Sequence, residues 1–153
     1  MFFENQYQIA YVTPDIREAT RILCDQFGVG EFMGLNGDAP VENRVWTPEG
    51  EVSITMRAMI AKVGHLILEV LEPVAGDTRI FSEMLVPGQP LRLHHIAMRC
   101  DDVDVIRAEH ARHGREVVMA GSFKAARFIY VDTRATLGHY LEYASAPPEY
   151  WQR

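Results

Sequence analysis

At two places in the chain, a run of apolar residues with the alternating spacing of a strand is followed by a run with the spacing of a helix. A short apolar strand that begins at Gln8 leads into a helical stretch from about Pro14 to Phe27, for which Thr13 is the predicted N-cap. A similar strand that begins at His95 leads into a helical stretch from about Val103 to His113. The spacing of the first helix is set by Ile16, Ala19, Leu23 and Phe27. The pattern therefore predicts an internal repeat.

Three strand-like segments follow each predicted helix. They cover about Val41–Trp46, Glu51–Ala61 and His65–Leu71 in the first half, and about Glu116–Met119, Arg127–Val131 and His139–Tyr143 in the second. We therefore expect the α+β class, with two βαβββ modules in one domain that covers residues 1–153. Module 1 covers about residues 6–73, and module 2 about 92–144. A glycine- and proline-containing linker of about residues 74–91 holds one short helix near 78–85, and residues 145–153 form a C-terminal tail.

Four polar residues occupy matching positions in the two halves, each among apolar neighbours of a predicted strand. Gln8 matches His95 in the first strand of each half, and Glu69 matches Glu142 in the last strand. Each residue alone has an ordinary explanation, such as a solvent-facing glutamate on an edge strand. A buried carboxylate, however, costs several kcal/mol without compensation, and two converging carboxylates repel each other. A divalent metal ion removes both costs, so Gln8, Glu69, His95 and Glu142 are the predicted ligands of one such ion.

The ligand types restrict the metal without identifying it. Oxygen and imidazole donors suit zinc, nickel, cobalt, manganese or iron, and the absence of thiolates from the set argues against a structural zinc site. Cys24 and Cys100 are the only two cysteines and form no CxxC pair, which predicts reduced thiols rather than a redox motif.

Composition excludes several classes of partner. Apolar residues make up 48% and charged residues 24% of the chain, as in ordinary globular proteins. The net charge of −6 argues against nucleic acid or an anionic membrane as the main partner. No segment approaches the roughly 20 apolar residues of a membrane-spanning helix. The first residues show no signal-peptide pattern, so we expect a cytoplasmic protein.

Short motifs in this order resemble a known superfamily. They are Ile9-Ala10-Tyr11, Pro14-Asp15, Phe27-Gly28, Leu93-His94-His95 with Asp101-Asp102-Val103-Asp104, and Leu141-Glu142. From about Gln6 to Tyr143 the chain resembles the vicinal-oxygen-chelate superfamily of glyoxalase I, methylmalonyl-CoA epimerase, bleomycin-resistance proteins and extradiol dioxygenases. The resemblance implies a curved mixed sheet around a metal-binding cup, with ligands from the first and last strands of each module. It also implies a small-molecule substrate and a homodimer.

The chain departs from each branch of this superfamily at some position. A Gln/Glu/His/Glu set resembles some glyoxalase I enzymes, whereas epimerases usually have histidine in the place of Gln8. The first histidine of an extradiol iron site would also fall on Gln8, so the resemblance makes iron the less favoured metal. The loop of residues 132–138 lacks the DPDG-like turn of many glyoxalase-type proteins. The second catalytic carboxylate of the epimerases has no clear match. The substrate therefore stays open.

The resemblance implies an isomerase or lyase that acts on a substrate with vicinal oxygens. The metal polarises the substrate and stabilises an enediolate, while a carboxylate moves the proton. Glu142 is the first candidate for this base and Glu69 the second. Arg127 is a candidate anchor for an anionic substrate group, with an ordinary surface arginine as the alternative. Two other functions stay open: a non-catalytic binding or resistance protein of the same fold, and an extradiol-type dioxygenase.

Overall fold

The computed structural model describes residues 1–152, and the chain forms two compact units. Unit 1 consists of Met1–Tyr7, Arg44–Val52 and His95–Arg153, and unit 2 consists of Gln8–Asn43 and Ser53–His94.

The strands are β1 (Gln6–Val12), β2 (Met33–Asp38), β3 (Val41–Thr47), β4 (Gly50–Val63), β5 (Leu66–Gly76), β6 (Arg92–Arg99), β7 (Val117–Phe123), β8 (Ala126–Val131) and β9 (Tyr140–Ser145). The helices are α1 (Ile16–Phe27), α2 (Arg79–Ser82), α3 (Val103–Arg112), α4 (Arg134–Leu137) and the 3₁₀ helix η1 (Pro148–Gln152). No helix in the described part is long and apolar enough to cross a bilayer.

The predicted α+β class with a mixed sheet is confirmed, since each unit combines parallel and antiparallel strands with few helices. In unit 2, β5 pairs in parallel with β1 and antiparallel with β4. In unit 1, β9 pairs in parallel with β6 and antiparallel with β8, and β7 pairs with β8. In each unit the first strand of a sequence repeat therefore lies beside the last strand of the same repeat.

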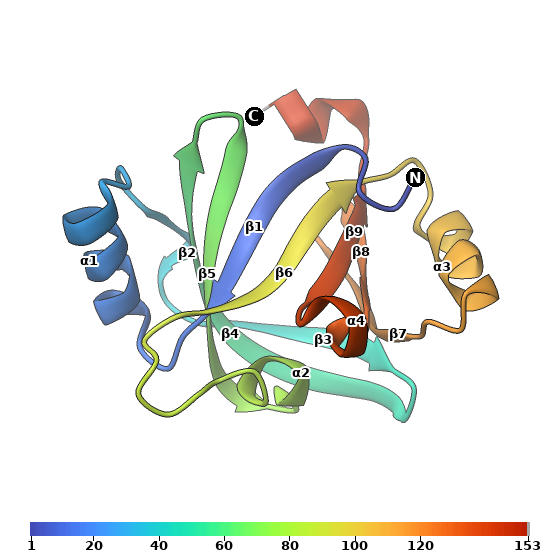
Figure 1. Ribbon diagram of the computed structural model, residues 1–153, viewed down its shortest axis with the longest axis horizontal. Helices are drawn as coiled ribbons and strands as arrows, with labels where there is room; N and C mark the ends of the chain where they lie inside the picture. Colours follow the sequence, from blue (N-terminus) through green and yellow to red (C-terminus); the bar gives the residue numbers. More distant parts are fainter. Residues whose placement is uncertain (153) are drawn as a thin grey trace. The chain divides into compact units, whose positions relative to one another are not determined.

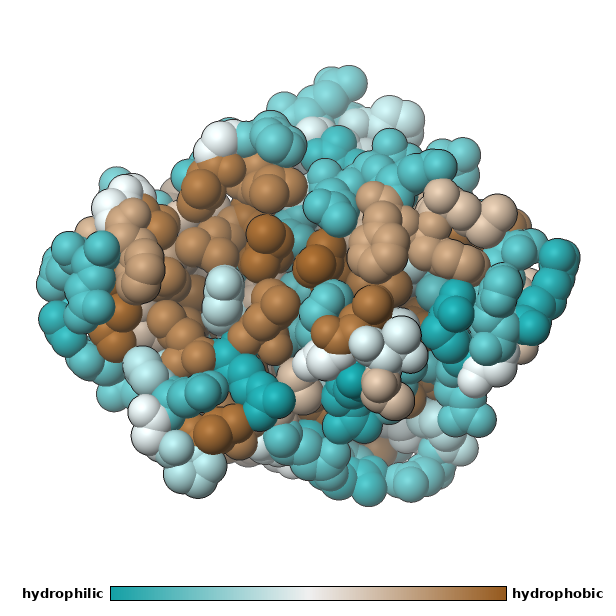
Figure 2. Space-filling view, in the orientation of Figure 1, coloured by the Kyte–Doolittle hydropathy of each residue, from teal (hydrophilic) through white to brown (hydrophobic). Residues whose placement is uncertain are grey.

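Helix α1 of unit 2 covers one face of the strands of that unit. Ile16, Ala19 and Leu23 are buried and pack against Val70 of β5. In Figure 1, α1 is the blue helix, and Figure 2 shows its polar outer surface beside apolar side chains over β1 and β5. The helix begins later than the sequence predicts, because the Asp15 carboxylate rather than Thr13 accepts the first free amides.

Helix α3 of unit 1 is positioned in the same way. The Asp102 side chain caps α3 by accepting from the Asp104 amide at 2.8 Å. Figure 1 shows α3 in gold, and it contacts β8 and β9. The buried cluster beneath it consists of Met98, Val103, Val117, Ile129, Val131, Leu141 and Tyr143. The opposite faces of β6 and β9 therefore remain for other side chains.

Some elements differ from the sequence prediction. Strand β5 continues to Gly76 rather than ending near Leu71, so the linker is shorter than expected. Strand β2 is not predicted, because its polar and glycine-containing sequence lacks alternation; it pairs with β4 at Met33 and Gly34. The loop before β9 forms the short helix α4, which ends at Gly138 in the left-handed conformation.

A buried histidine fastens the N-terminal residues to unit 1. Arg115 Nε donates to His110 Nδ1 at 2.8 Å, so His110 Nε2 carries the proton and donates to the Tyr143 hydroxyl at 2.9 Å. That hydroxyl donates to the Phe2 carbonyl at 2.9 Å, and the Phe2 ring lies 4.2 Å from the His110 ring. Burial, followed by the positive charges of Arg115 and His113, lowers the pKa of His110 from 6.5 to about 4.

This lowered pKa predicts acid sensitivity. The folded protein favours neutral His110, so its contribution to stability is complete above pH 6.5 and is lost as the pH falls toward 4. Between pH 7.5 and pH 4.5 we expect the melting temperature of His110→Gln to fall by several degrees less than that of the wild type. His65→Gln alters an exposed histidine and should retain the wild-type slope. Equal slopes in all three proteins would show that His110 does not carry this dependence.

Candidate functional site

The two predicted ligands of unit 2 lie together on one face of its sheet. In the parallel pairing of β1 with β5, Gln8 is opposite Ile67, which places Glu69 two residues further along. Residues two apart on a strand share a face, so both side chains project to the same side. Gln8 Nε2 donates to Glu69 Oε2 at 3.2 Å, and the two residues are only 8% and 9% exposed.

The two predicted ligands of unit 1 repeat this arrangement. His95 of β6 is opposite Tyr140 of β9, and Glu142 again lies two residues further along. His95 Nε2 and Glu142 Oε2 are 2.7 Å apart, and the residues are 0% and 8% exposed. The internal repeat therefore extends from the order of elements to the register at which each polar pair forms.

Burial controls the charge of the His95–Glu142 pair. It raises the pKa of Glu142 from 4.5 to about 8, and a hydrogen bond from Tyr130 only partly opposes this. Burial, with a smaller contribution from the charge of His139, lowers the pKa of His95 from 6.5 to about 3. Burial thus disfavours the charged form of both side chains where they contact each other.

Tyr130 is a site residue that the sequence pattern did not single out. It lies directly opposite Glu142 in the antiparallel pairing of β8 with β9, and its side chain hydrogen-bonds to the glutamate. Its ring meets the His95 ring edge-on, with centroids 5.0 Å apart. From sequence alone Tyr130 reads as a core or wall aromatic. The signal that could have found it is its alignment with Glu142 on the neighbouring strand.

The donor types of the four residues fit a divalent metal ion. Two carboxylates balance the charge of such an ion, while a neutral imidazole and an amide oxygen add uncharged donors. Among the described residues, no group of three or more histidine, cysteine, aspartate or glutamate side chains is placed to hold a metal ion. Each unit supplies one pair.

Two other residues near the predicted site face elsewhere. Arg127 of β8 is three residues from Tyr130 and so lies on the opposite face. Its side chain is 60% exposed and reaches Asp104 of α3 at 3.3 Å. His94, next to His95, instead stacks on Phe81, and its Nε2 lies 2.8 Å from the Ile80 carbonyl oxygen. The structure does not bring Arg127 together with the His95–Glu142 pair.

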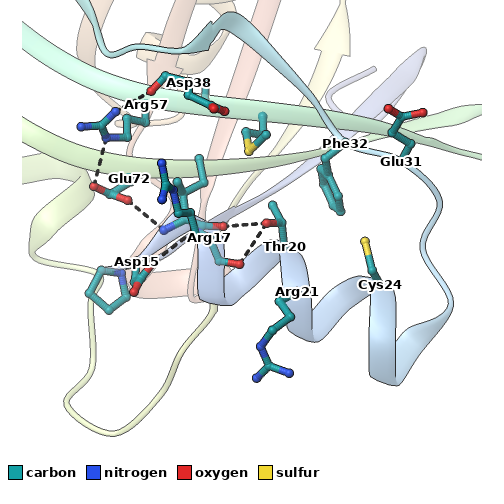
Figure 3. A pocket seen from close by; sticks show the side chains of 14 residues that line it. Asp15, Arg17, Thr20, Arg21, Cys24, Glu31, Phe32, Asp38, Arg57 and Glu72 are labelled. Atoms are coloured by element: carbon teal, nitrogen blue, oxygen red, sulfur yellow. Dashed lines mark hydrogen bonds and ion pairs between the residues drawn. The ribbon is translucent and has the colours of Figure 1, made fainter.

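A cavity of about 640 Å³ lies in unit 2 beside α1, away from the predicted ligands (Figure 3). Its polar groups largely bond to one another. Glu72 accepts from the Ile16 amide at 2.8 Å, and Arg57 lies 3.5 Å from the same carboxylate. The lining residues are Pro14, Asp15, Ile16, Arg17, Thr20, Arg21, Cys24, Glu31, Phe32, Asp38, Arg57, Ala58, Met59 and Glu72. Since no predicted site residue is among them, this cavity is not the predicted site.

Comparison with known protein families tests the superfamily resemblance that the motifs suggested. Residues 7–131 match the Glyoxalase/Bleomycin resistance protein/Dioxygenase superfamily. The chain belongs to this superfamily. The resemblance to vicinal-oxygen-chelate proteins is thereby confirmed. Among curated proteins, none matches the chain.

Solved structures with the same fold include several epimerases. Methylmalonyl-CoA epimerase from Mycobacterium tuberculosis is 12% identical, with 99% of this chain and 94% of that chain covered and a TM-score of 0.61. A second methylmalonyl-CoA epimerase is 23% identical, with coverages of 96% and 98% and a TM-score of 0.57. A hypothetical protein from Bacillus halodurans C-125 is 14% identical, with 94% of each chain covered and a TM-score of 0.59. At these identities the likeness establishes the superfamily fold alone.

The buried His95–Glu142 pair makes a prediction about stability without metal. Either His95→Leu or Glu142→Leu removes one partner of this buried polar contact, and each should lower the free energy of unfolding by about 1–3 kcal/mol. The double variant removes both polar groups and should be more stable than the sum of the single effects predicts, with a coupling of about 0.5–3 kcal/mol. Urea unfolding in the presence of a chelator measures the cycle. Strict additivity would show that the two side chains do not interact in solution.

Proposed function

We propose that this protein is a metal-dependent isomerase or lyase, with Gln8, Glu69, His95 and Glu142 as the ligands of one divalent ion. The observation that carries the proposal is the repeated register of the two buried pairs. A fold does not require a carboxylate beside an amide or imidazole at the same offset in both repeats. Burial makes such pairs costly, and a shared ligand is a reason to keep both.

The roles of the ligands follow from their chemistry. Glu69 and Glu142 would contribute carboxylate oxygens, Gln8 its amide oxygen and His95 the Nε2 lone pair. The lowered pKa of His95 keeps the imidazole neutral, which a metal ligand must be. When bound, the ion supplies Lewis acidity that polarises a substrate carbonyl and acidifies the neighbouring C–H bond. Zinc, nickel, cobalt and manganese suit this set, with iron less favoured.

Glu142 is the proposed general base. Its carboxylate takes the proton from the substrate carbon, and return of that proton to a neighbouring atom is isomerisation. Epimerisation would need a second group, for which Glu69 is the candidate, to deliver a proton to the opposite side of the carbon. Without a bound ion, burial raises the pKa of Glu142, which favours proton uptake by its carboxylate. Glu69 is the second candidate, because it has the corresponding position beside Gln8.

The substrate class is a small molecule with two neighbouring oxygen functions. A solved epimerase of this fold carries methylmalonyl-CoA and is 18% identical to this chain over 94% of its length, with a TM-score of 0.57. Acyl thioesters with a 2-carboxylate are therefore the first compounds to test, followed by hemithioacetals. Because Arg127 faces α3, a carboxylate of the substrate would need another partner in the site.

Metal binding tests the shared ligand set. We expect one divalent ion per chain after loading with excess Co²⁺ or Zn²⁺ and desalting, measured by elemental analysis. Gln8→Ala, Glu69→Gln, His95→Ala and Glu142→Gln should each weaken binding, because all four contact the same ion. His65→Ala, at an exposed position, is the matched control and should bind as the wild type does. Two ions per chain, or loss confined to one pair, would contradict a shared site. A folded protein without metal affinity would favour the binding or resistance role.

Proton exchange tests the chemistry. In D₂O, the metal-loaded protein should exchange the hydrogen at the acidic carbon of 2-methylmalonyl thioesters or related substrates, as measured by NMR. Glu142→Gln should reduce the exchange rate by about 10²–10⁴-fold, the usual contribution of a general base. Glu51→Gln alters an exposed glutamate paired with Arg44 and should retain the wild-type rate. Full exchange by Glu142→Gln would remove Glu142 as the base, and Glu69→Gln would then be examined in the same assay.

A further inference from the structure

We propose that Tyr130 is a positioning residue of this site, which orients the Glu142 carboxylate through its hydroxyl and the His95 imidazole through its ring. The inference rests on the proposed function, since it assigns to Tyr130 a role toward the metal ion. It concerns three residues of unit 1 alone, so it depends only on contacts within that unit.

The strand register places Tyr130 where it can act on both partners. Directly opposite residues of an antiparallel pair project to the same face, so Tyr130 and Glu142 share a face of β8 and β9. The Tyr130 ring stands nearly perpendicular to the His95 ring, at an interplanar angle of 78°. Phe128 contacts Tyr130, with ring centroids 5.8 Å apart. Packing on two sides holds the tyrosine ring in a defined position.

The hydroxyl supplies a donor that suits a metal-binding carboxylate. Glu142 Oε2 lies beside His95 Nε2, and a donor from Tyr130 fixes the orientation of the carboxyl group without adding a competing charge. Hydrogen bonds of this kind set the direction of a ligating carboxylate, and their removal typically costs about 10–100-fold in metal affinity.

A neighbouring tyrosine provides a matched comparison. Tyr143 is adjacent to Glu142 on β9 but projects to the other face, where its hydroxyl contacts Phe2 and His110. Both tyrosines are buried in unit 1, and both hydroxyls are hydrogen-bonded. Loss of either hydroxyl should lower stability. Only the loss of the Tyr130 hydroxyl should change the metal site.

Cobalt titration separates these two effects. We expect Tyr130→Phe, which retains the ring against His95, to raise the Kd for Co²⁺ by about 10–100-fold and to change the visible absorption bands of the bound ion. Tyr143→Phe should leave the Kd and the bands unchanged although its melting temperature falls. All titrations are done well below the melting temperature of each variant, with circular dichroism to confirm folding.

The possible outcomes distinguish this inference from the proposed function. If the wild type binds no Co²⁺, both are overturned. If the wild type binds and Tyr130→Phe has the same Kd and spectrum, the positioning role is overturned and the metal site stands. Equal weakening in Tyr130→Phe and Tyr143→Phe also overturns it, because the effect would then follow general loss of stability. Selective weakening in Tyr130→Phe supports it.

Discussion

The parallel pairing of first and last strands in each repeat is the constraint on which the site depends. Because β1 lies beside β5 and β6 beside β9, two residues far apart in sequence face the same side at a fixed offset. Helices cover the other side through Ile16, Leu23 and Val103. Each polar pair thereby lies on the face opposite these helices and is largely withdrawn from water, where hydrogen bonds are strengthened by the apolar surroundings.

Much of this arrangement could be read from the sequence, because spacing and repetition carry long-range information. The shift from strand to helical spacing located α1 and α3, and the comparison of the two halves aligned Gln8 with His95. The sequence did not show which of two neighbouring side chains would cap a helix. Asp15 caps the helix in place of Thr13, whose hydroxyl accepts from the Asp15 amide and donates to the carbonyl of Pro90, a residue brought close only by folding. Strand β2 escaped prediction for a similar reason, since a few tertiary hydrogen bonds define it.

The two buried polar pairs were predictable in part for the same physical reason. A charged residue within an apolar strand is conspicuous, and Glu69 and Glu142 stood out at matching positions. An aromatic residue in such a strand is ordinary, so Tyr130 carried no signal until the register placed it opposite Glu142. Arg127 was conspicuous by charge, yet strand alternation directs it toward α3. Which side of a strand a residue occupies is thus decided by the pairing of neighbouring strands.

The path of the chain through β3 and β4 affects whether the protein can be cut into two fragments that fold independently. Residues 44–52 belong to the same compact unit as the second repeat, although they lie inside the first repeat in sequence. Trp46 pairs there with Ala120 of β7, and Arg107 stacks on its indole ring. A cut near residue 91 would therefore not release two self-sufficient halves, since the C-terminal fragment would lack a hairpin that its own fold uses. Reassembly of the severed protein would require the N-terminal fragment to contribute residues 44–52 to the fold of the C-terminal fragment.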